Sequence, residues 1–112
     1  MSDTTETPVL DLLASMTADS IEASSLDAET LMLVRIAALV AVDAPPASYL
    51  MNLGAASELD IDVDQVRGVL AAVAPIVGTA RVASAMSKIV RALELELELE
   101  IAELEAEAEE EA

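Results

Sequence analysis

Residues 27–42 read DAETLMLVRIAALVAV, and this stretch predicts the helix around which the chain is organised. Asp27 can accept hydrogen bonds from the free amides of a first helical turn, and Glu29 suits the positive end of the helix dipole. From residue 31 onward aliphatic side chains cover every side, and Arg35 carries the only charge. A helix that is apolar all round lies at the centre of a fold or between subunits. We therefore expect a helix in one of these two positions, with Arg35 in an internal ion pair with an Asp or Glu. The alternative for Arg35 is a ligand-binding role.

The residues that follow predict two more helices. The segment DAPP at residues 43–46 ends the first one, because a proline biases the residue before it away from helical geometry, and the second proline suits the start of a helix over residues 47–58. Asp62 and Gln65 have the spacing of a capping box and predict the start of the next helix. Pro75 and Gly78 should kink or end it.

The N-terminal part has weaker signals. Residues 1–8 are polar, and we expect them to be disordered. Aliphatic residues at helical spacing predict a short helix over residues 9–16, followed by a link over 17–26, with a short helix inside the link as the alternative. No segment before residue 93 alternates convincingly with the period of a strand, so the predicted fold class is all-α. The predicted organisation is a helical domain over residues 9–92 and an acidic tail over 93–112.

The tail begins with LELELELEI at residues 93–101, an alternation that is typical of a strand. A helical projection nevertheless gathers the aliphatic residues of the C-terminal part into two opposite seams. One seam contains Val82, Met86, Ile89, Leu93, Leu97, Ile101 and Leu104, and the other Ala92, Leu95, Leu99, Ala102 and Ala106. Leu, Ala and Glu are good helix formers, whereas Glu and Ala are poor in strands. We predict a long terminal helix whose seams each pack on a different neighbour; the alternative is an amphipathic strand that pairs with other chains.

Composition excludes several kinds of chemistry. The chain has 112 residues, the length of one domain, and contains no Cys, His, Trp or Phe. It therefore has no disulfide, thiol nucleophile, imidazole base or histidine metal ligand. We expect no cofactor and no metal, although the strips of glutamate along the tail helix leave a carboxylate cation site as an alternative.

The charge balance restricts the partners. Five basic against 22 acidic residues give a net charge of −17. Binding to nucleic acid or to an anionic membrane surface needs clustered cations, so we expect neither. No apolar run reaches the ~20 residues of a membrane helix, and the N-terminus lacks the basic residues of a secretory signal. These features favour a cytoplasmic protein.

The amount of aliphatic surface favours self-association. Apolar residues make up 54% of the chain, but a lone domain of this size buries only about two-thirds of the surface of its unfolded chain. The remaining apolar surface must stay exposed or be covered by another chain. We therefore expect a homo-oligomer.

Four segments resemble a known family. They are LDAETLMLVRIAAL at residues 26–39, APP at 44–46, DQVRGVL at 64–70 and APIVGTA at 74–80. In this pattern the chain, from residue 26 to about 93, resembles the carboxymuconolactone decarboxylase family, which includes the alkyl hydroperoxidase D-like proteins. The resemblance implies a small helical bundle that assembles into trimers or hexamers.

The chain departs from that family at the residues that carry its chemistry. Hydroperoxidase members use a pair of cysteines with a nearby glutamate and histidine, and this chain has no cysteine, which excludes thiol peroxidase activity. Decarboxylase members carry a histidine where Asn52 falls, and often a cysteine where Val77 falls. Both replacements remove proton-transfer or nucleophilic capacity.

A pocket at the family position would be lined by Tyr49, Asn52, Val77, Gly78 and Arg81, and these are the candidate site residues. Arg81 could hold a carboxylate in a bidentate pair. The alternative is that Asn52 caps or bridges backbone groups and that Arg81 forms an interchain salt bridge.

These observations favour a non-catalytic homo-oligomeric assembly or binding protein. Two alternatives stay open. One is a cofactor-free lyase or isomerase that acts on a small carboxylated lactone. The other is a module that binds a small apolar ligand.

Overall fold

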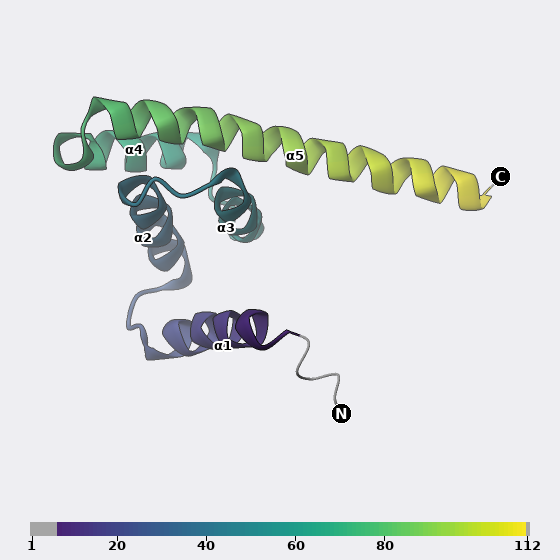
Figure 1. Ribbon diagram of the computed structural model, residues 1–112, viewed down its shortest axis with the longest axis horizontal. Coiled ribbons are helices and arrows are strands. Elements are labelled where there is room, and N and C mark those ends of the chain that lie inside the picture. Colours follow the sequence, from purple (N-terminus) through teal and green to yellow (C-terminus); the bar gives the residue numbers. More distant parts are fainter. Residues whose placement is uncertain (1–6, 112) are drawn as a thin grey trace.

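The computed structural model describes residues 7–111, which form five α-helices and no strand (Figure 1). The helices are α1 (Pro8–Ala23), α2 (Ala28–Ala41), α3 (Pro46–Glu58), α4 (Val63–Val77) and α5 (Thr79–Glu111). The all-α class is therefore confirmed. The disorder predicted over residues 1–8 falls mostly outside the described residues, and Pro8 is the first residue of α1.

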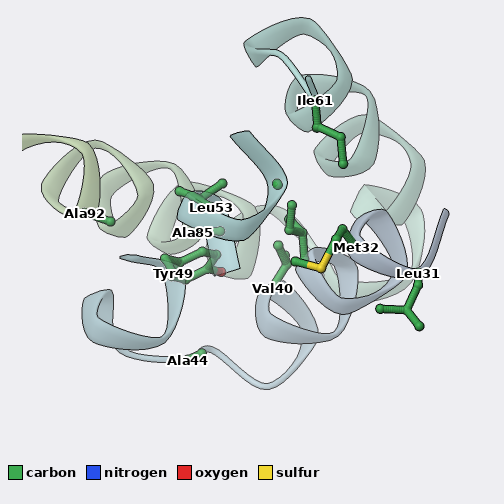
Figure 2. Close-up of a cluster of buried hydrophobic side chains, with 11 residues drawn as sticks. Leu31, Met32, Val40, Ala44, Tyr49, Leu53, Ile61, Ala85 and Ala92 are labelled. Carbon is green, nitrogen blue, oxygen red and sulfur yellow. The ribbon is translucent and has the colours of Figure 1, made fainter. Parts of the chain in front are cut away.

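The core lies where α2, α3, α4 and α5 meet (Figure 2). Helix α2 contacts α3, α4 and α5, which agrees with the central position, one of the two predicted from its aliphatic sequence. The largest fully buried side chains are Ile36 and Val40 of α2 and Tyr49 of α3. From α5 only Ala85 and Ala92 are buried, and these small side chains let its backbone lie close to α3.

Local chemistry sets the helix boundaries as the sequence predicts. The Asp27 carboxylate accepts a hydrogen bond from the Thr30 amide at 2.8 Å. Asp62 and Gln65 form the predicted capping box, each side chain bonding the other residue's backbone amide. Helix α4 ends at Val77, where Gly78 adopts a φ of 89° that a side chain would disfavour.

Two aspartates occupy positions after helix ends that glycine usually takes. Asp43 after α2 and Asp60 after α3 have φ values of 56° and 64°. In both cases the next residue donates back to the carbonyl five positions earlier, Ala44 to Leu39 at 3.0 Å and Ile61 to Ala56 at 3.1 Å. This is the Schellman motif, and it brings the chain sharply back into the bundle.

The N-terminal helix differs from its prediction. The link predicted over residues 17–26 is helical through Ala23, so α1 has 16 residues rather than one short segment. None of its residues is buried. Among residues 7–111 Arg35 has no acidic partner of the kind predicted; its guanidinium instead donates to the Ser20 hydroxyl at 3.0 Å and to the Thr17 carbonyl at 3.5 Å. Arg35 therefore attaches α1 to the bundle through uncharged groups.

Helix α5 has 33 residues, and its second half extends beyond the other helices (Figure 1). The tail is thus helical, as predicted, and the strand alternative is wrong. No break separates residues 9–92 from the tail, because one helix runs through both. The radius of gyration is 16.6 Å, against about 13 Å for a compact domain of this length, and the projecting α5 accounts for part of this difference.

Candidate functional site

The candidate residues on α3 have structural partners. Tyr49 is fully buried, and Figure 2 shows its ring beside Leu53 and Ala85. Burial raises the pKa of the Tyr49 phenol, and the nearby Asp43 carboxylate raises it further. Its hydroxyl has no hydrogen-bond partner among the described residues. A neutral, enclosed phenol with a raised pKa cannot act as a base near neutral pH, so this arrangement makes Tyr49 a packing residue.

Asn52 is half-buried one turn further along α3. Its side-chain amide nitrogen donates to the Ser48 carbonyl at 2.8 Å. This bond agrees with the alternative prediction that Asn52 bridges backbone groups. An amide held by its own helix has less freedom to bind a ligand. The structure therefore gives Asn52 a local role in α3.

The other three candidates lie at the turn between α4 and α5. Val77 is the half-buried last residue of α4, and the exposed Gly78 links it to α5. Arg81, in the first turn of α5, donates to the carbonyl of Ala41 at the end of α2. That contact places a cation at a helix C-terminus, where it is electrostatically favourable. None of the five candidate residues borders either of the apolar hollows described below.

A polar cluster that the sequence did not indicate ties α5 to the corner between α2 and α3. The Asp43 carboxylate accepts from the Ser84 hydroxyl at 2.7 Å and from the Lys88 ammonium at 2.9 Å. Lys88 also donates to the Asp43 carbonyl at 3.3 Å. Hydrogen bonds from Lys88 and Ser84 lower the pKa of Asp43 below its ordinary value of 3.8. The available signal was modest: Ser84 and Lys88 lie four residues apart on one helical face, and Lys88 is the single lysine of the chain.

All five basic side chains of the chain have protein partners. Besides Arg35, Arg81 and Lys88, Arg67 pairs with Asp64 at 2.9 Å and Arg91 lies 3.6 Å from Glu94. These last two pairs are exposed and of low strength. An anionic ligand would have to compete with a partner at each cation. Among residues 7–111, no group of three carboxylates gathers in an arrangement that could hold a metal ion.

Two apolar hollows lie at the edges of the bundle. The first has a volume of about 270 Å³ and lies between α3, α4 and α5; its walls are Leu53, Ala56, Ser57, Ile61, Asp62, Val63, Val66, Ile89, Leu93 and Glu96. The second, of about 330 Å³, is bordered by Ile21, Leu26, Ala28, Leu31, Met32, Ala55, Glu58 and Leu59. The charged side chains of both hollows are carboxylates. Either hollow would therefore favour a neutral apolar group over an acid.

Large aliphatic side chains also cover much of the outer surface. On α1 the exposed ones are Val9, Leu10, Leu12, Leu13, Met16 and Ile21. On α5 they are Met86, Val90, Leu93, Leu97, Leu99, Ile101 and Leu104. Single exposed aliphatic residues are ordinary, but here they recur along α1 and between Met86 and Leu104 of α5.

The total exposed area is large for a chain of this mass. The chain exposes 7714 Å², whereas a compact monomer of 11.7 kDa exposes about 5,900 Å². The difference is about 1,800 Å² per chain, compared with about 800 Å² that each partner contributes to a typical stable interface. One chain therefore has enough uncovered surface for an extensive contact.

In the described part of the chain, no helix is both long enough and apolar enough to cross a membrane. Comparison with family models, with curated proteins and with solved structures found no match.

Proposed function

We propose that the protein is a non-catalytic, homo-oligomeric assembly protein. The observation that carries this proposal is the uncovered aliphatic surface of α1 and α5. In isolation these rows would be exposed to water, and burying them between copies would remove that cost at about 25 cal/mol per Å² of apolar area. The high acidity keeps the outer faces of such an assembly soluble.

The arrangement of polar groups supports a structural role over a catalytic one. The five basic side chains are engaged with protein groups, and Tyr49 is enclosed within the core. The lyase alternative needs Arg81 to hold a substrate carboxylate, and its contact with Ala41 competes with that use. No polar residue of the candidate set borders an apolar hollow, so the enzyme has less support than the assembly.

The proposal includes the resemblance to the carboxymuconolactone decarboxylase family over residues 26–93. That region corresponds to α2, α3, α4 and the first half of α5, which are the helices that form the core. It also includes a cytoplasmic location without a cofactor. A net charge of −17 makes nucleic acid an unsuitable partner.

Sedimentation equilibrium of the full chain at micromolar concentrations tests the assembly. We expect a molar mass that is a multiple of 11.7 kDa, with the far-ultraviolet circular dichroism of a helical protein. A well-folded particle of 11.7 kDa over the whole concentration range would contradict the proposal.

A second candidate function is the binding of a small neutral apolar ligand, favoured by the hollow between α3, α4 and α5. Its aliphatic walls suit an alkyl chain, and Asp62 and Glu96 stand at its border. Titration with a neutral alkyl alcohol tests this function. Saturable binding should be lost in Val66→Glu and retained in Leu99→Glu, because Leu99 is not part of the hollow; the absence of saturable binding to the unmodified chain would contradict it.

A further inference from the structure

Resting on the proposed assembly, we propose that its contact is an antiparallel pairing of α5 with the α5 helix of a second copy. The contact surface is the outer seam, defined here as Met86, Val90, Leu93, Leu97, Ile101 and Leu104. All six side chains are substantially exposed. The seam is made of residues from both halves of the helix, so it includes the part that extends beyond the bundle (Figure 1).

The outer seam follows one line along a straight helix. Its successive spacings are 4, 3, 4, 4 and 3 residues, a mean of 3.6, which is the period of an α-helix. From Met86 to Leu104, a separation of 18 positions, the seam is about 27 Å long. The first residues of the opposite seam pack on the bundle, since Ala92 is buried in the core and Leu95 is half-buried. The opposite seam is therefore partly packed on the bundle, whereas the six side chains of the outer seam stay exposed.

The seam is complementary to itself when the second helix runs in the opposite direction. Met86 then lies opposite Leu104, Val90 opposite Ile101, and Leu93 opposite Leu97. The midpoints of these three pairs all fall at residue 95 or between residues 95 and 96. A two-fold axis at that level would bring every member of the seam against another member. Side chains at such spacings interlock between antiparallel helices as they do in coiled coils.

Charge favours the antiparallel direction over the parallel one. In α5, residues 79–92 contain Arg81, Lys88 and Arg91 and no acid, whereas residues 93–111 contain ten glutamates and no base. Parallel pairing would set the two acidic halves side by side. Antiparallel pairing sets each acidic half along the half of the partner helix that carries the three cations, and it also opposes the two helix dipoles.

The seam also continues into the bundle. Leu93 belongs to the outer seam and to the wall of the hollow between α3, α4 and α5. A helix that lies along the seam therefore borders both surfaces at once. This continuity gives the partner helix more apolar area than an isolated helix pair would offer.

Disulfide trapping tests the direction of the pairing, because the natural chain has no cysteine. The double variant Met86→Cys/Leu104→Cys should form covalent dimers on mild oxidation, since the two positions face each other across the interface. Within one chain they are about 27 Å apart, far beyond the ~6 Å between Cα atoms in a disulfide. Each single variant should stay uncrosslinked alone, and an equal mixture of the two should crosslink.

Crosslinking of either single variant with itself would overturn the antiparallel direction. No crosslinking in any sample, with an oligomeric mass for the unmodified chain, would overturn this contact and leave the proposed assembly in place. A mass of 11.7 kDa at all concentrations would overturn both.

A matched pair of glutamate variants gives a second test without oxidation. Leu97 and Leu99 are both 56% exposed and both on the projecting half of α5, but only Leu97 lies on the outer seam. Leu97→Glu should raise the dissociation constant roughly tenfold or more, because it puts a carboxylate at the centre of an apolar contact twice per pair. Leu99→Glu should change it about twofold or less, as expected of a surface position outside the contact. Equal effects of the two variants would overturn the choice of seam.

Discussion

Replacing Tyr49 with phenylalanine should make the protein more stable, because the change removes a buried hydroxyl that has no hydrogen-bond partner. The side chain is 0% exposed, and its hydroxyl is unpaired among the described residues. A buried unsatisfied polar group costs about 1–3 kcal/mol, while the contacts of one lost oxygen atom are worth a few tenths of a kcal/mol. The ring stays in the same buried cluster as Leu53 and Ala85 (Figure 2).

We therefore expect the free energy of unfolding to rise by about 1 kcal/mol, equivalent to about 4 °C or more in Tm for a domain of this size. Urea denaturation followed by far-ultraviolet circular dichroism measures it, since Tyr49 is the only aromatic residue and the variant lacks tyrosine fluorescence. Protein concentrations must be matched, because assembly adds to apparent stability. Tyr49→Ala is the control and should lose about 3–5 kcal/mol through the cavity it creates. A phenylalanine variant less stable than the unmodified protein would refute the reasoning and would mean that the hydroxyl has a partner.

Three further perturbations test local parts of the structure. Gly54→Ala should stabilise the protein by about 1 kcal/mol, because Gly54 lies inside α3 and a Cβ there meets open space. Gly78→Ala should destabilise it by about 1–2 kcal/mol, because a side chain is strained at the φ of 89°. The two variants should therefore shift the thermal unfolding temperature in opposite directions. Asp43→Asn should lower Tm at pH 7. The Tm difference between the two proteins should shrink as the pH falls below about 4. Folding lowers the pKa of Asp43, so the carboxylate stabilises the folded state above its unfolded pKa, and this stabilisation is lost as the pH falls through the folded pKa. A Tm difference that grows on acidification would contradict the role of the cluster. Self-association should strengthen from low to high salt, because each chain carries a net charge of −17 and salt shortens the range of the repulsion between copies. Dissociation on adding salt, measured by sedimentation, would contradict this expectation.

The helices were largely predictable because their signals are local. Asp27, Asp62 and Gly78 act on amides and carbonyls within four residues of themselves, so their effect does not depend on the rest of the fold. The tail was the ambiguous case, since its two-residue alternation is typical of strands. The intrinsic helix preference of Leu, Ala and Glu decided it correctly.

The candidate site was predictable in smaller part. The alternative role of Asn52 as a bridge to the backbone is confirmed, because that bond spans one helical turn. The partners of Arg35 and Arg81 were not predicted, because they are uncharged groups 15 to 40 positions away that no pattern of charges marks. The Asp43 cluster was missed because Asp43 lies more than 40 positions from both Ser84 and Lys88, a separation that no local spacing marks.

The sequence by itself determined that the chain is helical, where most of its helices begin and end, and that it lacks thiol and imidazole chemistry, because these properties reside in single residues and short spacings. The tertiary structure alone decided which side of α5 packs on the bundle, which side stays uncovered, and that the phenol of Tyr49 is enclosed. These outcomes depend on packing between side chains that are distant in sequence. Ala85 and Ala92 are the buried residues of α5, and their small size lets α5 lie close to α3.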